Sequence, residues 1–417
     1  MFYIHGGGFS TGSGDGAMLD GTYLAKYGDV VVVTVNHRLN VFGYTNLAHL
    51  HRDFADAANA GQLDLVAALE WVKTNIGAFG GEPQNVTAFG ESGGGAKIVA
   101  LSVMPDANGL FHRSINMSGS GAFSLKPAVA AEPLTNELLK VLGIDVANVR
   151  KLQEIPAEQL LAAHATAMAN LKSDQSRPVV DGRYIFHAPM SPEGIALQAS
   201  IPGIMSRTAT EATPWLVADR RNLQVTAEQL STRLKAQYGL DDAQAAAVSK
   251  GYRQDDPNRT PWDVLVAAAS EALVRSPMRH AAEARSRAGA APVYLCDFDW
   301  KSSVEGGIWG APHAIDIPFA FGTLDQNRMT AGSDAGAIEA SRNLMSAYVA
   351  FSRTGIPNDR RTPQWKPYDI ATRPTMVFDK MSRLVNDFRS GDRRTSDRLS
   401  QQPTFQLMSG PLFRFSA

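Results

Sequence analysis

A five-residue run, Gly90-Glu91-Ser92-Gly93-Gly94, constrains the fold of this chain more than any other feature of its sequence. A β-rich run at 86–89 precedes it, and a helical pattern at 93–104 begins within it. Glycines two positions before and after a serine permit a sharp strand-to-helix turn that exposes the serine hydroxyl. Taken alone, the run could be a glycine-rich turn capped by serine. Between a strand and a helix, it predicts an α/β sheet with Ser92 as a nucleophile.

Short β-branched or aromatic runs alternate with helical patterns, which predicts a mostly parallel sheet with helices on both faces. We expect strands at 2–4, 30–35, 86–89, 114–117, 201–205 and 293–297. We expect helices at 62–75, 93–104, 157–170, 227–238, 263–288 and 335–354. Residues at about 122–200 and 213–291 show no clear core strand and are interpreted as helical cap insertions. A single α/β domain over 1–417 is therefore expected.

The charge, the cysteine content and the apolar runs of the sequence argue against several classes of protein. The formal net charge is −1, with neither sign dominating a long stretch, so no basic face for nucleic acid is expected. Cys296 is the only cysteine, which favours a reducing compartment. The start of the chain does not resemble a signal peptide, and the longest apolar run, 264–269, is far too short to span a membrane. We expect a cytoplasmic location, with secretion through a preceding segment left open; the sequence does not constrain the oligomeric state.

Three consecutive glycines lie in the run 5–9, directly after the first expected strand. Such a loop lets backbone N–H groups approach a substrate oxygen without an intervening side chain. Acyl transfer needs donors of this kind, and losing one costs roughly 3–4 kcal/mol of barrier. We expect donors from Gly7, Gly8 and Gly93, with a phosphate-binding nest or a flexible turn as the alternative. His5 precedes Ser92 and is expected to orient the loop.

The general base is expected to be a histidine that follows the serine, because this kind of fold orders its triad as serine, acid, histidine. His313 lies in an irregular loop after the last expected strand, where parallel sheets place their chemistry. The other histidines lie too early, in helical patterns or before the acid candidates; they are His112, His164, His187 and His280. Glu211 follows an expected strand, but position alone leaves Asp219 and Glu193 open as the acid. Asp316 is too close to His313 in the chain.

These blocks resemble the type-B carboxylesterases of the α/β-hydrolase superfamily, which include the cholinesterases and bacterial p-nitrobenzyl esterases. The matching segments lie at 5–9, 35–44, 63–95, 201–212 and 310–322. The resemblance implies an α/β-hydrolase fold, hydrolysis of carboxylic esters, and a triad of Ser92, Glu211 and His313. It selects Glu211 as the acid, and it matches Gly7, Gly8 and Gly93 to the oxyanion donors and Glu91 to a buried residue before the serine.

The chain departs from the family pattern at two places. Gly93 stands where alanine is usual, a difference that should leave the backbone donor intact. Members of the family also carry a substantial segment before the HGGGF block, which this chain lacks. We therefore interpret the chain as N-terminally shortened and expect a more open substrate pocket.

The expected mechanism is two-step acyl transfer through an acyl-enzyme, without a metal or cofactor. No cluster of His, Cys and Asp has metal-ligand spacing, and Lys97 is expected to make a structural polar contact rather than act as a base. Aromatic residues near the catalytic blocks could line a pocket for small apolar or aromatic esters, or belong to the core; they are Phe9, Phe42, Phe123, Trp309 and Phe319. Amide, carbamate or thioester hydrolysis and a catalytically impaired binding protein remain alternatives.

Overall fold

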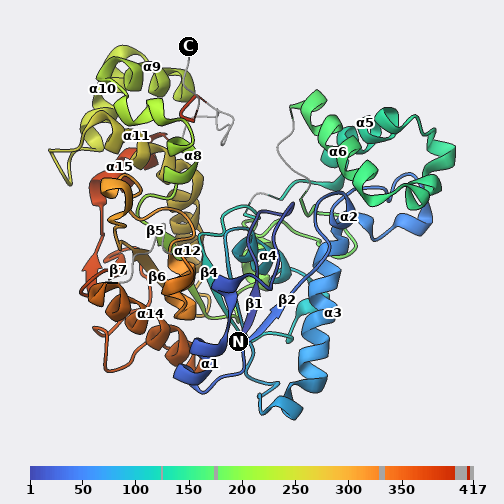
Figure 1. The fold of residues 1–417 in the computed structure, drawn as a ribbon, viewed down its shortest axis with the longest axis horizontal. Coiled ribbons are helices and arrows are strands. Elements are labelled where there is room, and N and C mark those ends of the chain that lie inside the picture. The colour runs from blue at the N-terminus through green and yellow to red at the C-terminus, as the bar shows by residue number, and fades with distance from the viewer. Residues whose placement is uncertain (124, 173–176, 328–333, 400–410, 414–417) are drawn as a thin grey trace. The chain divides into compact units, whose positions relative to one another are not determined.

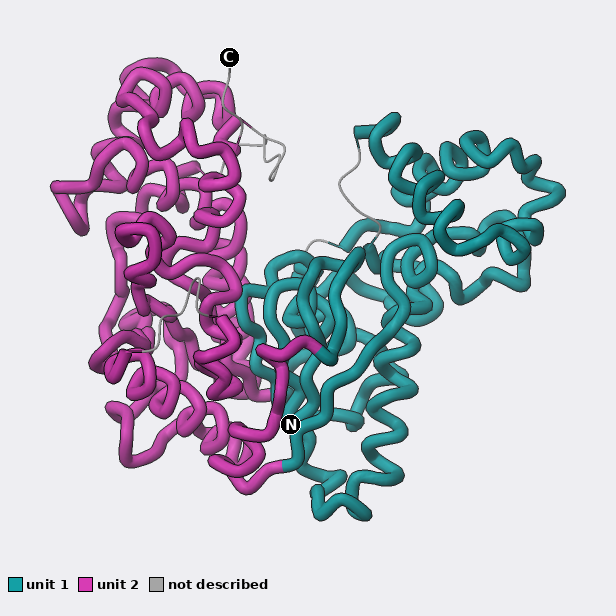
Figure 2. Tube along the Cα trace, viewed as in Figure 1, with its two compact units in different colours: residues 1–15, 31–201 teal, residues 16–30, 202–417 magenta. Residues whose placement is uncertain are grey.

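A computed structural model describes residues 1–123, 125–172, 177–327, 334–399 and 411–413. The chain divides into two compact units (Figure 2). Unit 1 consists of residues 1–15 and 31–201, and unit 2 consists of residues 16–30 and 202–417. The expected single domain stays a prediction.

Unit 1 is built on four parallel strands in the order β2-β1-β3-β4. Their bounds are β1 Phe2–Ile4, β2 Val33–Val35, β3 Thr87–Glu91 and β4 Arg113–Met117. Every residue of β1 and β3 is buried, as expected for parallel strands covered on both faces. Helix α4 (Gly93–Leu101) packs against β1, β3 and β4, and α3 (Ala60–Asn75) packs against α4 (Figure 1).

Unit 2 is built on strands in the order β5-β6-β7-β8. Their bounds are β5 Gly203–Thr208, β6 Val293–Phe298, β7 Pro374–Phe378 and β8 Arg383–Asn386; the first three are parallel and β8 is antiparallel to β7. Helix α12 (Ser276–Arg287) packs against β5 and β6, and α14 (Ala335–Thr354) packs against β7 (Figure 1). Mostly parallel strands flanked by helices, as expected from the sequence, are therefore confirmed.

The two regions expected to form caps are helical. In unit 1, α5 (Glu132–Leu142) and α6 (Ala157–Leu171) pack together, away from the strands of their unit (Figure 1), around Leu138, Ala163 and Ala167. In unit 2, a separate apolar cluster joins several helices; they are α8 Thr213–Val217, α9 Ala227–Tyr238, α10 Asp242–Gly251 and α11 Pro261–Ser270. The remaining helices are α1 Thr22–Gly28, α2 Asn40–Gly43, α7 Pro192–Leu197, α13 Asp316–Phe321 and α15 Ser390–Leu399.

The helix expected at 263–288 is not one regular α-helix. It consists of α11, a π-helical turn at Glu271–Arg275, and α12. Pro277, in the first turn of α12, has no N–H to donate, so α-helical hydrogen bonding cannot run unbroken through this segment. The wider π turn accommodates the interruption and places Glu271 and Arg275 in the interior of unit 2.

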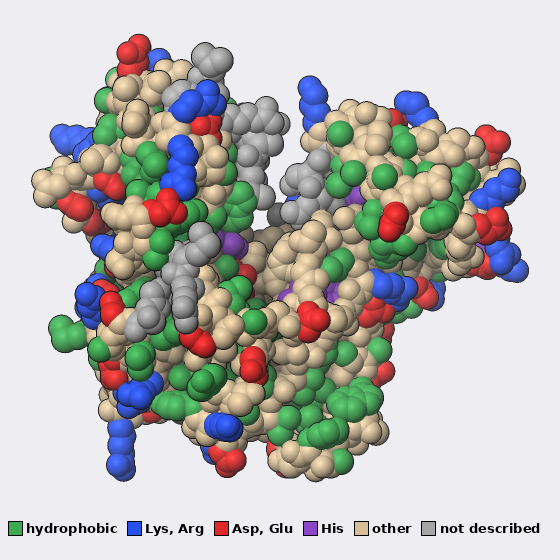
Figure 3. All heavy atoms as spheres, in the orientation of Figure 1, with side chains coloured by type: hydrophobic (Ala, Val, Ile, Leu, Met, Phe, Trp, Pro, Cys, Tyr) green, Lys and Arg blue, Asp and Glu red, His purple; other side chains and the backbone are tan. Residues whose placement is uncertain are grey.

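The surface is mixed in charge. Acidic and basic side chains are interspersed on the face shown in Figure 3, in line with the near-neutral net charge. Among the described residues, no helix is both long enough and apolar enough to cross a bilayer.

Candidate active site

Ser92 lies at the turn between β3 and α4, in unit 1. Its φ of 52° and ψ of −118° belong to a region that non-glycine residues rarely occupy. The backbone holds this conformation at both ends, because Ser92 N donates to Met117 O (2.7 Å) and Ala96 N donates to Ser92 O (3.0 Å). Ser92 is partly exposed between buried neighbours, and its side chain makes no capping bond to α4. The Ser92 hydroxyl is therefore held at a strained turn and does not cap the helix.

The glycines on either side of Ser92 are required by the close approach of β1. A Cβ atom at Gly90 would lie 2.6 Å from Ile4 O, and one at Gly94 would lie 1.9 Å from the same oxygen. Real Cβ atoms do not approach backbone this closely. The G-x-S-x-G spacing therefore lets α4 begin directly against the end of β1.

The glycine loop at 5–9 lies against the start of α4. Gly7 and Gly8 have φ values of 83° and 63°, which glycine adopts at no steric cost. Ser10 N and Thr11 N donate to Gly7 O (3.3 and 3.1 Å), and Asn40 N donates to Phe9 O (2.7 Å). A Cβ atom on Gly93 would lie 2.1 Å from Gly8 O. The structure thus brings together two expected oxyanion residues, Gly8 and Gly93, and leaves no room for a side chain at position 93.

Glu211 and His313 form a hydrogen-bonded pair in unit 2. His313 Nδ1 lies 2.6 Å from Glu211 Oε2, and Thr208 N donates to Glu211 Oε1 (2.6 Å). The Glu211 side chain is fully buried, whereas that of His313 is 11% exposed. A carboxylate at Nδ1 favours the tautomer with its proton on that nitrogen, so Nε2 is the nitrogen that can act as a base.

The loops that carry Glu211 and His313 are bound to each other through Thr210. Thr210 N donates to Ala311 O (2.9 Å), and Thr210 Oγ1 donates to Trp309 O (3.1 Å). Gly310 has a φ of 59°, and a Cβ atom there would lie 2.7 Å from Thr210 Oγ1. These contacts fix the acid and the imidazole across 102 residues of sequence.

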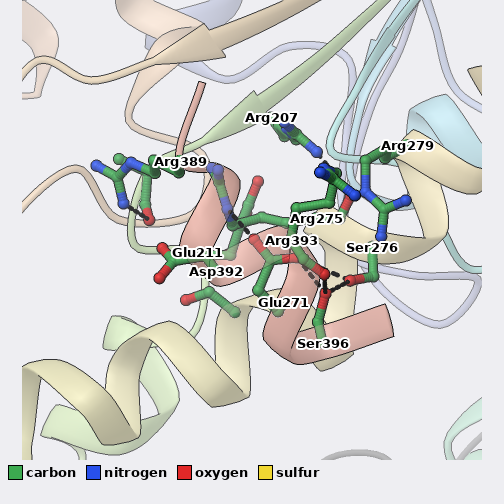
Figure 4. Close-up of polar contacts among 12 residues, drawn as sticks. Arg207, Glu211, Glu271, Arg275, Ser276, Arg279, Arg389, Asp392, Arg393 and Ser396 are labelled. Carbon is green, nitrogen blue, oxygen red and sulfur yellow. Dashed lines mark hydrogen bonds and ion pairs between the residues drawn. The ribbon is translucent and has the colours of Figure 1, made fainter. Parts of the chain in front are cut away.

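A buried network of ion pairs supports the end of β5, from which the Glu211 loop begins (Figure 4). Arg275 donates to Thr208 O (2.9 Å) and pairs with Asp297 of β6. Arg207 of β5 also donates to Asp297 (3.0 Å). Further side chains of this network come from α12 and α15; they are Ser276, Arg279, Asp392, Arg393 and Ser396 (Figure 4). Local sequence patterns do not predict this network, because its partners are far apart in the chain.

The remaining candidates have other surroundings. His112 Nδ1 accepts from Val86 N (3.1 Å), and His280 lies 3.3 Å from Asp397. His164 is buried in α6, where burial lowers its pKa. The last three candidates are His187, which is exposed, Glu193 at the start of α7, and Asp219, which pairs with Arg221. Among the histidine and acid candidates, only His313 and Glu211 are hydrogen-bonded to each other in the described part of the chain.

The aromatic candidates occupy different environments. Phe319 is fully buried against Phe298 and Trp300, which favours the core interpretation. Phe9 and Phe123 are buried, Phe42 is exposed, and Trp309 is half-buried. An aromatic residue that sequence reasoning missed, Trp215, packs against His313 with ring centroids 5.1 Å apart. Its position four residues after Glu211 was the only signal in the sequence.

The expected site residues thus form two groups. Ser92, Gly7, Gly8 and Gly93 belong to unit 1, and Glu211 and His313 belong to unit 2. Within the described ranges, no group of three or more His, Cys, Asp or Glu residues is arranged to hold a metal ion. A strained, partly exposed serine and a carboxylate-bound histidine are the parts that serine acyl transfer requires.

Comparison with protein families matches residues 1–395 to the carboxylesterase family. The chain is 33% identical to the para-nitrobenzyl esterase of Bacillus subtilis, over 94% of this chain and 78% of the esterase. It is 30% identical to the phenmedipham hydrolase of Pseudarthrobacter oxydans over the same shares.

Solved structures show the same relationship. The carboxylesterase of Geobacillus stearothermophilus superposes with a TM-score of 0.81 at 34% identity, covering 94% of this chain and 81% of that one. An esterase from Clostridium hathewayi that can hydrolyse aliphatic aromatic polyesters superposes with a TM-score of 0.76 at 30% identity, covering 96% of this chain and 79% of that one.

Proposed function

We propose, from the premise that this chain belongs to the carboxylesterase family and is a serine hydrolase of carboxylic esters, that Ser92, His313 and Glu211 are its catalytic triad. The observation that carries the proposal is the 2.6 Å hydrogen bond between His313 Nδ1 and the buried Glu211. The strained turn at Ser92 and the glycine loop beside Gly93 support it. The proposal requires that the two groups of residues meet during catalysis.

In this mechanism Ser92 Oγ attacks the ester carbonyl while His313 Nε2 takes the hydroxyl proton. Glu211 keeps the imidazole in the required tautomer and stabilises its protonated form. The N–H groups of Gly7, Gly8 and Gly93 donate to the oxyanion of the tetrahedral intermediate. The imidazolium then protonates the departing alcohol, and water repeats the sequence on the acyl-enzyme.

The proposed substrates are small esters with an apolar or aromatic group. Trp215 places an aromatic face beside His313, and the half-buried Trp309 lies on the loop that leads to His313. Aromatic side chains near a catalytic base favour apolar ligand groups. The names of two relatives, a para-nitrobenzyl esterase and an esterase acting on aliphatic aromatic polyesters, agree with this class.

The triad assignment is tested by labelling the full chain with a fluorophosphonate probe and locating the adduct by mass spectrometry. We expect a single adduct on Ser92 and none in Ser92→Ala. A series of p-nitrophenyl esters, with matched amides and carbamates, then defines the substrate class. An unlabelled Ser92 in native protein that hydrolyses esters would refute the assignment.

A further inference from the structure

A buried lysine lies beneath the glycine loop. Lys97 is on α4, four residues after Gly93, and therefore one helical turn further along the same face. Its side chain is fully buried, and Nζ donates to His5 O at 3.1 Å. His5 is the first residue after β1, just beyond the last paired position, Ile4–Gly90. The lysine therefore holds the point where the chain leaves the sheet to form the loop.

The same ammonium also contacts the other end of the loop. Lys97 Nζ lies 5.8 Å from the centre of the Phe9 ring, a distance typical of a cation–π contact. Phe9 is itself buried and packs edge-on against Tyr44. The Lys97 side chain thus contacts the residues on both sides of the three glycines, through a hydrogen bond to the residue before them and a ring contact with the residue after them.

Burying a cation in this position costs desolvation free energy, which argues that Lys97 does more than fill space. Burial lowers the pKa of Lys97 to about 7, and no carboxylate pairs with it among the described residues. His5 and His37 stack on each other with centroids 4.8 Å apart, and burial together with the charge of Lys97 lowers the pKa of both imidazoles. A methionine would fill similar space without the desolvation cost.

We propose that Lys97 is a positioning residue that holds the loop at 5–9 in its oxyanion-binding conformation through the bond to His5 O and the contact with Phe9. This rests on the proposed role of Gly7, Gly8 and Gly93 as oxyanion donors. The lysine does not act as a base, since its ammonium is directed at a backbone carbonyl. Its effect is specific to the transition state, in which the oxyanion forms, and substrate binding should depend on it little.

The test compares Lys97→Met with wild type, using the concentration of Ser92 titrated by fluorophosphonate to normalise kcat. A trifluoromethyl ketone, which accepts Ser92 Oγ at its carbonyl carbon and becomes an oxyanion, reports on the loop directly. We expect kcat to fall about 10- to 100-fold and the inhibition constant of the ketone to rise by a similar factor. KM should stay within about threefold.

Arg285→Met is the matched control, because Arg285 is a buried cation of α12 whose pKa is lowered to about 10 by burial. It should leave kcat and ketone affinity unchanged. Lys97→Leu repeats the measurement if Lys97→Met does not fold. Wild-type kcat in the lysine variants, a loss of kcat without weaker ketone binding, or failure of both lysine variants to fold would overturn the proposal. Failure of wild type to label at Ser92 would instead refute the triad.

Discussion

At the residue scale, backbone geometry decides what Ser92 can do. Its positive φ costs on the order of 1–3 kcal/mol, and two hydrogen bonds from neighbouring elements maintain it. Three positions around it require glycine because of close contacts rather than flexibility, since a Cβ atom at any of them would clash with backbone. The motif is therefore a packing requirement of β1, β3 and α4 as well as a catalytic signature.

Gly93→Ala should weaken catalysis. The added Cβ would lie 2.1 Å from Gly8 O, so the glycine loop must move, and its backbone N–H donors move with it. We expect kcat to fall by up to about 100-fold for the same ester, with KM less affected. Gly77→Ala is the control, because a Cβ atom there has no neighbour within 4 Å. Equal kcat in the two variants would show that the loop adapts freely.

Glu211→Gln should lower kcat by about 10⁴-fold, because an amide can hold the imidazole in the wrong tautomer. Wild-type kcat/KM should rise with pH as His313 loses its proton and becomes able to act as a base. Steady-state kinetics from about pH 5 to 8 measure both effects over the range in which histidine titrates. Asp219→Asn is the control, since that carboxylate pairs with Arg221. A flat wild-type profile would argue against His313 as the base.

Trp215→Ala should alter substrate preference more than chemistry. The centroids of the indole and His313 rings lie 5.1 Å apart, so the indole can contact an aromatic acyl or alcohol group. We expect KM for p-nitrophenyl benzoate to rise about tenfold, and KM for the acetate to change less, because stacking area is lost. Trp71→Ala, at an exposed position on α3, is the control. A uniform change across the ester series would assign Trp215 a structural role.

At the element scale, the strand that leads to Glu211 depends on buried charge. Arg207 and Arg275 both pair with Asp297, and these side chains are almost completely buried. Although burial raises the pKa of Asp297, the two arginines keep it below its ordinary value. β5, β6, the π-helical turn and α15 are therefore joined by electrostatics as well as by apolar packing.

Arg275→Met should destabilise the protein by about 3–5 kcal/mol, because it removes the ion-pair partner of the buried Glu271 and one of the two arginines that pair with Asp297. Urea unfolding at constant pH measures the loss as a change in midpoint with an unchanged slope. Arg221→Met removes an exposed pair and should cost less than about 1 kcal/mol. Similar losses for the two variants would mean that the network contributes little to stability.

The sequence predicted elements best where their ends are encoded locally. The bounds of α9 and α14 match the prediction, because Thr226 and Asp334 cap their starts and Gly239 and Gly355 their ends. β7 and β8 were missed among turn residues. β5 lies at Gly203–Thr208 rather than 201–205, since its polar second half is buried only through tertiary pairing. Ser92 and the glycine loop were predicted because their motifs are local in the sequence. Glu211 could be selected only through the family resemblance, and Trp215 was not predicted, because their roles depend on contacts with residues far away in the chain.

At the scale of the whole molecule, the proposed triad depends on two units that are interleaved in sequence. The chain passes between them after residues 15, 30 and 201, so neither unit is one continuous segment. Residues 16–30 belong with the second unit although they follow the glycine loop directly. Tests of catalysis and stability therefore require the full chain rather than fragments.

The pH dependence of global stability should reveal the buried lysine. The unfolded chain keeps the Lys97 proton up to its ordinary pKa of 10.5, whereas the folded chain releases it at about 7. Between these values the unfolded state binds more protons, so stability rises with pH, by at most about 1.4 kcal/mol per pH unit. Below pH 7 both states are protonated and the contribution of Lys97 is constant.

The difference in unfolding free energy between wild type and Lys97→Met reports this contribution above about pH 7, because His5 and His37, whose pKa values depend on the charge of Lys97, are then neutral in both proteins. In urea unfolding at several pH values from 6 to 10, the free energy of unfolding of wild type should increase relative to that of the variant above about pH 7. Arg285→Met should show a difference that is constant up to about pH 9, since its pKa is lowered only to about 10. A constant difference for Lys97→Met would mean that the ammonium keeps its proton in the folded protein. The lysine would then hold the glycine loop as a full charge throughout the pH range in which His313 is active as a base.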